Sequence, residues 1–269
     1  MPHVSERIAV FGGVYSNHLA LEAVLEDARR AGAHEIYCLG DVGAFGPRPD
    51  RSIEILRGSR VRVMQGNYDD SVGNALPDCQ CGYTDPRDNH YAEISYAYTL
   101  RETSEDNRAW LRDLPKSFRT TLGGRRVSMA HGSPRRVNEF LWESTTPDPF
   151  VRRLLREGDA DLVLVTHTGI HWRRMLDDEP GRGLVNVGAI GRADNDGDPA
   201  VHYALLTATT DPARPIDVDF RRVEYDHARL AAEMRTEGLP EEFVETILTG
   251  WWTTCLEVLP AKERSRSRY

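Results

Sequence analysis

Residues 8–25 have the sequence IAVFGGVYSNHLALEAVL, which predicts a strand, a glycine turn and a helix. The strand is the apolar run at residues 7–11, and apolar residues then recur at helical spacing over residues 19–31. Further strands are expected at residues 35–39 and 61–64, with a helix around residues 53–56 between them. This alternation indicates parallel strands joined by right-handed crossovers, whose carboxyl-terminal loops are free to carry chemistry.

The middle of the chain, roughly residues 74–115, predicts a small helical insert over the sheet. It begins with a polar, turn-rich stretch and continues with helices at 91–101 and 104–114. Strands are then expected at 126–130, 162–166, 184–187, 201–206 and 218–223, and helices at 227–235 and 241–248. The last strands lie close together with turns between them, which favours antiparallel pairing. We expect one domain over residues 1–258 and a basic, disordered tail at residues 259–269.

The composition of the 269 residues is that of a globular protein, with 40% hydrophobic and 28% charged residues. The 42 acidic side chains outnumber the 34 Lys and Arg, and the net charge of −8 argues against a broad surface for nucleic acid or for an anionic membrane. No apolar run approaches the ~20 residues of a membrane span. Four cysteines are too few for a disulfide scaffold, and the N-terminus lacks a signal-peptide core, so we expect a cytoplasmic protein.

Four short polar motifs each follow a predicted strand. They are Gly-Asp at Asp41, Gly-Asn at Asn67, His-Gly at His131, and Thr-His-Thr-Gly at His167. A carboxylate, an amide oxygen and two imidazoles form a mixed oxygen and nitrogen set that suits a borderline divalent ion. Any one of these residues alone is more often an ordinary loop residue. All four in order, each at a strand end, favour a metal site.

These motifs and their surroundings resemble the calcineurin-like metallophosphoesterases, in particular their small single-domain bacterial branch. The resemblance runs from Arg7 to about Leu206, and it is densest at residues 8–25, 35–49, 64–69, 129–134 and 186–206. It implies an α/β fold, a four-layer α/β/β/α sandwich with metal at the carboxyl ends of the strands.

The resemblance also assigns roles to the four motif residues. Asp41, Asn67, His131 and His167 match the ligands of one of the two metals of the family. The residues that bind only the other metal in the family are missing here, because Gly13, Tyr15 and Gly169 stand at their positions. We therefore expect one divalent or iron-type ion (Mn, Fe, Zn or Co), and a second ion only if its site is rebuilt from different residues.

The proton-donating histidine of the family is replaced as well. Tyr68 stands at its position, and a phenol is a poorer acid than an imidazole at neutral pH. Asp69 keeps the position that supports the family's histidine. Arg135 and Arg136 directly follow the His131 motif and are the candidate phosphate clamps, because guanidinium binds oxyanions in a bidentate manner. The sequence predicts Tyr68, Asp69 and Arg135 as catalytic residues.

Several residues near the lost ligand positions are candidates for contacts with the substrate or a second ion. They are Tyr15, Asn17 and His171, together with Arg136. Tyr15 could bind ferric iron as tyrosinate, could contact the substrate, or could fill the vacated metal pocket with its ring. His171, like His18, could bind metal or be an ordinary loop or helix-start histidine.

A second unusual cluster is Cys79-Gln80-Cys81 in the predicted insert. It could hold zinc together with the downstream His90, carry reactive thiols near the active site, or form a plain turn. The spacing does not distinguish these three alternatives, because a second pair at tetrahedral-site spacing is missing.

The function that follows is a metal-dependent phosphoesterase acting on a small phosphorylated metabolite through a reduced, mononuclear metal site. We expect weak activity on generic aryl phosphates, since one of two metals is gone. Two alternatives remain: a non-catalytic relative that binds metal or ligand, and an altered iron-dependent reaction on the same fold. The partner expected is the small substrate, with no nucleic acid and no membrane.

Overall fold

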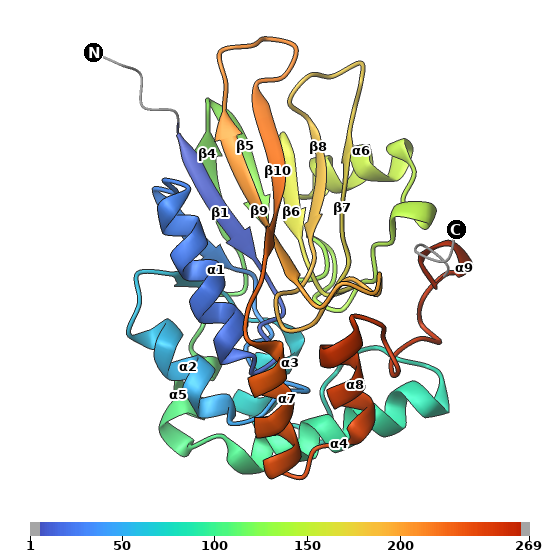
Figure 1. The fold of residues 1–269 in the computed structure, drawn as a ribbon. Coiled ribbons are helices and arrows are strands. Elements are labelled where there is room, and N and C mark those ends of the chain that lie inside the picture. Colours follow the sequence, from blue (N-terminus) through green and yellow to red (C-terminus); the bar gives the residue numbers. More distant parts are fainter. Residues whose placement is uncertain (1–5, 265–269) are drawn as a thin grey trace.

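The computed structural model describes residues 6–264 and contains two five-stranded sheets packed face to face (Figure 1). The strands of the first sheet, in spatial order, are β10 (Ile216–Val223), β9 (Val201–Ala208), β1 (Arg7–Phe11), β2 (Glu35–Cys38) and β3 (Arg62–Val63). Those of the second are β4 (Phe118–Leu122), β5 (Arg125–Met129), β6 (Leu162–Val165), β8 (Gly183–Val187) and β7 (His171–Met175).

Helices cover the outer faces of both sheets and the ends of their strands. They are α1 (His18–Arg30), α2 (Pro49–Arg57), α3 (Asn67–Gly73), α4 (Pro86–Glu102), α5 (Glu105–Arg112), α6 (Asp148–Glu157), α7 (His227–Thr236), α8 (Glu241–Thr249) and α9 (Ala261–Arg264), with a 3-10 turn at Glu143–Thr145. Figure 1 shows α1 beside the first sheet and α6 beside the second. The fold is therefore the expected α/β/β/α sandwich. Within residues 6–264 no helix has both the length and the apolar character needed to cross a membrane.

The alternation of side chains in β1 explains these layers. Ile8 and Val10 lie in the core between the two sheets, whereas Ala9 and Phe11 face α1 and the other helices of the first side. Successive side chains of a strand point to opposite faces, so a strand that is apolar at every position is buried on both. Each fully buried side chain of this kind stabilises the fold by roughly 1.5–3 kcal/mol.

The strand directions bring the polar motifs together. β1 and β2 are parallel, as are β5, β6 and β8, while β9 is antiparallel to β1 and to β10. In Figure 1 the arrowhead of β1 points down, toward the end of the molecule where α4, α7 and α8 gather. The loops that follow β2, β3, β5 and β6 carry the four motifs.

Besides α9 and the 3-10 turn, four elements were not expected from the sequence. β4 and β7 are the edge strands of the second sheet, and their sequences, FRTTL and HWRRM, are too polar to stand out as strands. α3 begins within a motif that was expected to be a loop, and α6 occupies a segment for which no helix was expected.

The tail predicted to be disordered is wrong over its first part. α9 lies within it, and Glu263 is buried. The Glu263 carboxylate accepts hydrogen bonds from the backbone N–H (2.8 Å) and the hydroxyl (2.6 Å) of Ser144. Leu259 packs against Trp142 and Trp252 in a small apolar cluster. The hydrogen-bonded Glu263 carboxylate and this apolar packing therefore both hold the segment in place. The remainder, residues 265–269, lies outside the described residues.

Candidate metal centre

The loop after β2 presents Asp41 in an unusual backbone conformation. Asp41 has φ of 56° and follows Gly40, whose φ is 90°. A Cβ atom on Gly40 would lie 2.3 Å from the backbone nitrogen of Gly66, so glycine is required for the loops after β2 and β3 to approach. His167 also has a left-handed backbone, with φ of 68°. Strained residues of this kind cluster at functional sites.

Asp41, His131 and His167 form one buried cluster. The His131 Nε2 lies 3.2 Å from the Asp41 Oδ2 and 3.2 Å from the His167 Nδ1, and the three donor atoms all lie within 4.8 Å of one another. Burial, assisted by the neighbouring His131, lowers the pKa of His167 to about 3. His167 is therefore neutral at physiological pH, the form in which imidazole binds metal.

The neighbours of these ligand atoms fix their orientation. The His131 Nδ1 lies 2.7 Å from the carbonyl oxygen of Leu39, and donation to that oxygen leaves the Nε2 lone pair facing the cluster. The Asn67 Nδ2 donates to the carbonyl of Cys79 at 2.8 Å. The Asn67 Oδ1 is buried and has no hydrogen-bond partner among the described residues. A buried acceptor without a partner costs about 1–3 kcal/mol, which a bound cation would offset. The four side chains therefore fit a divalent ion.

Asp69 connects the motifs to each other. Its carboxylate accepts from the backbone N–H groups of Asp41 (2.7 Å), Val42 (2.9 Å) and Gly66 (2.8 Å). These bonds hold the Asp41 loop against the start of α3. Asp69 is thus a positioning residue for the cluster in this structure.

The Tyr68 hydroxyl does not lie free in the site. It makes a 2.7 Å hydrogen bond with the Ser95 hydroxyl of α4, and its ring packs edge-on against Tyr96. Burial raises the pKa of Tyr68 above its ordinary value. This environment favours a structural role for Tyr68 over the proton donation predicted from the sequence.

Tyr15 and Arg192 lie beside Gly13 and Gly169, the positions at which the resemblance places ligands of a second metal. A Cβ on Gly13 would lie 2.7 Å from the Tyr15 ring, and a Cβ on Gly169 would lie 3.5 Å from the Arg192 Nη2. The Tyr15 ring is buried, and burial raises its pKa. Of the three alternatives for Tyr15, the ring that fills the vacated pocket matches this arrangement.

The two predicted phosphate clamps differ in their surroundings. Arg135 lies 3.7 Å from both Glu139 and Glu157, so carboxylates already neutralise it. Arg136 is exposed and borders a cavity of about 220 Å³ beside His131, to which Lys116 also contributes. Arg136 is the better placed of the pair for an anion.

Asn17 and His18 lie at the start of α1, where Asn17 is the N-cap residue. The Asn17 Oδ1 caps the helix by accepting from the Ala20 N–H at 3.0 Å, and its Nδ2 donates to the Gly191 carbonyl at 3.2 Å. His18 is buried and lies 3.5 Å from Glu233 of α7. The side-chain oxygen and nitrogen of Asn17 are therefore both bonded within the protein.

His171 belongs to a second cluster, separate from the first. Its Nδ1 lies 2.8 Å from the Asp194 Oδ2, and the His202 Nδ1 lies 2.7 Å from the same oxygen. The His171 ring also packs on Phe220, with the ring centres 4.3 Å apart. Two imidazoles and a carboxylate in this arrangement could hold an ion, and both ring nitrogens lie within ion-pair distance of the same Asp194 oxygen.

The Cys79 and Cys81 sulfurs form a disulfide. Because neither is then a thiolate, neither the zinc site nor the reactive thiols suggested by the sequence fits this state of the chain. The bridged loop packs on the metal centre, since the Asn67 Nδ2 approaches the Cys81 Sγ at 3.6 Å as well as the Cys79 carbonyl.

Two neighbours of the centre were missed from the sequence. Phe140 packs against His167, with ring centres 4.5 Å apart, and Arg192 lies beside Tyr15. The one signal for Arg192 is a basic residue directly after the run of small and apolar residues GAIG at 188–191. No comparable signal marks Phe140.

Comparisons with known proteins identify the family and the fold. The family model described as the calcineurin-like phosphoesterase superfamily domain matches residues 7–211. A metallophosphoesterase from Sphaerobacter thermophilus is 29% identical, with a TM-score of 0.68, and the match covers 91% of this chain and 99% of that one. A hypothetical protein from Pyrococcus horikoshii has a TM-score of 0.73 at 23% identity, over 92% and 99% of the two chains.

A protein of Methanocaldococcus jannaschii, named as uncharacterized, is 27% identical over 259 residues, which are 92% of this chain and 99% of the relative. The family match extends over most of the chain and includes all four motif residues. The chain therefore belongs to the calcineurin-like phosphoesterase superfamily.

Proposed function

We propose that this protein is a metal-dependent phosphoesterase that hydrolyses a small phosphorylated metabolite at a mononuclear centre. The observation that carries the proposal is the buried Asn67 Oδ1, which has no hydrogen-bond partner among the described residues and belongs to the same motif set as the cluster of Asp41, His131 and His167. A carboxylate, an amide and two imidazoles would hold a single Mn, Fe, Zn or Co ion.

Such an ion supplies a Lewis acid that polarises a phosphoryl oxygen and lowers the pKa of water. The residues of the chain keep its ligands in place, through Asp69 for Asp41 and through the Leu39 carbonyl for His131. Arg136, beside the cavity that borders His131, is available to bind a phosphate. Tyr68 is bonded to Ser95 and adds no proton donor in this arrangement, so we expect weak turnover of generic aryl phosphates.

The test is a panel of phosphomonoesters and phosphodiesters with metal-free protein reloaded separately with Mn, Fe, Zn and Co. We expect at least one substrate to be cleaved with one of these metals, and Asn67→Ala to lose turnover while it keeps its fold. The absence of cleavage of every phosphoester with all four metals would refute the proposal.

A non-catalytic relative that binds metal or ligand is the second candidate. It is favoured by the hydrogen bond that holds the Tyr68 hydroxyl on Ser95, because the site then lacks an acid for the leaving group. In that case Asn67→Ala lowers the melting temperature of the metal-loaded protein, and there is no turnover to lose. The iron-dependent alternative predicts a tyrosinate-to-iron absorption band in iron-loaded protein.

A further inference from the structure

Arg192 is a buried cation that has no anionic partner among residues 6–264. Its side chain is 6% exposed. Within residues 6–264 its Nε has no hydrogen-bond partner, and no carboxylate lies within ion-pair distance of the guanidinium. Arginine is almost never buried in this way unless it is paired, because removing an unpaired charge from water is costly. The chain therefore keeps a positive charge here for which its described residues offer no counter-charge.

Aromatic rings hold the guanidinium in a fixed orientation. It lies 3.5 Å from the centre of the Trp252 ring, 5.2 Å from that of Phe45 and 5.7 Å from that of Tyr15. Ring faces attract the flat face of a guanidinium, but they leave the N–H groups on its edge free for an acceptor in the same plane. The arrangement fixes the orientation of the group and leaves its edge available.

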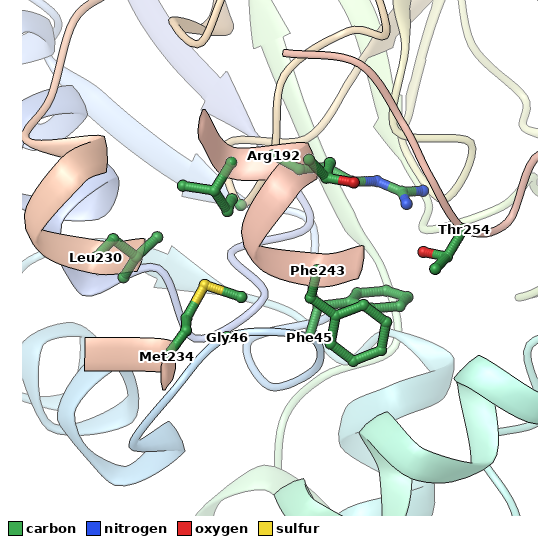
Figure 2. A pocket seen from close by; sticks show the side chains of 10 residues that line it. Phe45, Gly46, Arg192, Leu230, Met234, Phe243 and Thr254 are labelled. Carbon is green, nitrogen blue, oxygen red and sulfur yellow. The ribbon is translucent and has the colours of Figure 1, made fainter. Parts of the chain in front are cut away.

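The cavity on one side of Arg192 is too small for an anion. The cavity between the guanidinium and the helices α7 and α8 measures about 20 Å³ and is lined by apolar side chains such as Met234 and Phe243 (Figure 2). That volume holds about one water molecule and no phosphate. This cavity therefore has no room for an anion, and on the side of Gly169 a Cβ would lie 3.5 Å from the Arg192 Nη2.

Arg192 adjoins the loops of the candidate metal centre through Gly169 and Tyr15. Gly169 is two residues from His167, and Tyr15, which lies beside the guanidinium, donates its backbone N–H to the Asp41 carbonyl at 3.2 Å. Gly13 and Gly169 stand where the resemblance places two ligands of a second metal. The Arg192 guanidinium thus lies on the side of the centre where the resemblance would place the second metal ion.

We propose that Arg192 binds the phosphoryl oxygens of the substrate and supplies the positive charge that a second metal would otherwise bring. The proposal rests on the proposed function for its choice of substrate. The ligand class is a tetrahedral dianion, either a phosphate monoester or the inorganic phosphate released from one. The planar fork of N–H groups matches two oxygens of such an anion at once.

The test is calorimetric titration of inorganic phosphate into metal-loaded protein at fixed ionic strength, with the ions per chain measured for every variant. We expect Arg192→Met to lower phosphate affinity tenfold or more with the metal content unchanged, and Arg192→Lys to fall between Arg192→Met and the wild type. Arg153→Met, on the exposed side of α6, is the matched control and should bind phosphate as the wild type does. Phosphate affinity of Arg192→Met within twofold of the wild type would overturn the proposal. A loss in Arg136→Met instead of Arg192→Met would also overturn it.

A second measurement does not depend on the folding of Arg192→Met. Because the guanidinium stacks on Trp252, phosphate should change the tryptophan emission of the wild-type protein, and the change should vanish in Trp252→Phe. Saturating phosphate that leaves this emission unchanged counts against the proposal. The readouts also separate the two hypotheses. Phosphate binding that depends on Arg192, without cleavage of any ester, would refute the proposed enzyme function and support the anion site. If esters are cleaved and Arg192→Met changes neither phosphate binding nor kcat/KM, only the proposed anion site is refuted.

Discussion

The Asp69 carboxylate accepts a 2.7 Å hydrogen bond from the backbone N–H of Asp41, and this bond joins the start of α3 to the loop after β2. The same carboxylate also accepts from Val42 and Gly66. The Asp69 side chain, which is not itself in the cluster, therefore fixes the positions of two candidate metal ligands, Asp41 and Asn67, relative to each other.

Asp69→Asn should weaken this connection. An amide offers one accepting oxygen where the carboxylate offers two, so at least one of the three N–H groups loses its partner. We expect the free energy of unfolding to fall by about 1–3 kcal/mol and the metal affinity to fall by about tenfold or more. Chemical denaturation and metal titration measure the two effects. Asp70→Asn, whose side chain accepts only from exposed Asn74 among the described residues, is the control, and equal effects in both variants would contradict the assignment.

Metal removal should reveal a single high-affinity ion. We expect one ion per chain in the wild type, none in His131→Ala, and a melting temperature that rises when metal is restored to the wild type only. Elemental analysis and thermal unfolding measure these quantities. His171→Ala controls for the second cluster: if the wild type holds two ions and this variant one, the extra ion lies with Asp194 and His202. Two ions in both proteins would contradict a mononuclear centre.

His18 should make the protein less stable in mild acid. Burial, with a contribution from nearby Arg51, lowers the pKa of His18 to about 4. The unfolded chain takes up a proton near the ordinary value of ~6.5, and the folded chain does not until about pH 4, so stability is complete above that ordinary value and declines as pH falls between the two values. His18→Gln should therefore lose less melting temperature between pH 7 and pH 5 than the wild type. Exposed His34→Gln should behave as the wild type, and parallel curves for all three would refute the prediction.

Gly40→Ala should disrupt the centre more than a matched glycine substitution elsewhere. Gly40 and Gly124 both have positive φ, 90° and 75°, so alanine at either position carries a backbone cost of about 1–2 kcal/mol. A Cβ at Gly124 meets nothing within 4 Å, whereas one at Gly40 would lie 2.3 Å from the Gly66 nitrogen. We expect Gly40→Ala to be about 1–3 kcal/mol less stable than Gly124→Ala and to lose metal binding. Equal unfolding free energies for the two variants would show that the loops have room to move apart.

Local patterns in the sequence were sufficient for the inner strands of both sheets but not for the edge strands β4 and β7, and they located three of the candidate ligands. His131 and His167 follow neighbouring parallel strands of the second sheet, and parallel strands bring such positions to one edge. Asp41 follows β2 of the first sheet, so its approach to the two histidines depends on how the two sheets pack. Whether they hold metal remains a prediction.

The partners of Tyr68, Glu263 and Arg192 could not be predicted in the same way. Each depends on a contact with a distant segment: Tyr68 with Ser95 on α4, Glu263 with Ser144, and Arg192 with Trp252. No periodicity or spacing records such contacts, because they arise from how the helices and loops pack after the sheets have formed. The environment of a candidate site was therefore harder to predict than its ligands.

The guanidinium beside the centre also distinguishes two kinds of positive charge. A coordinated ion exchanges with the medium, so a chelator, a change in metal supply or a competing cation can remove it. The charge of Arg192 is part of the covalent chain and stays under all of these conditions. If the proposed ion and Arg192 act together, metal starvation removes only part of the positive charge, and the metal-free protein keeps the Arg192 cation beside Tyr15, Phe45 and Trp252.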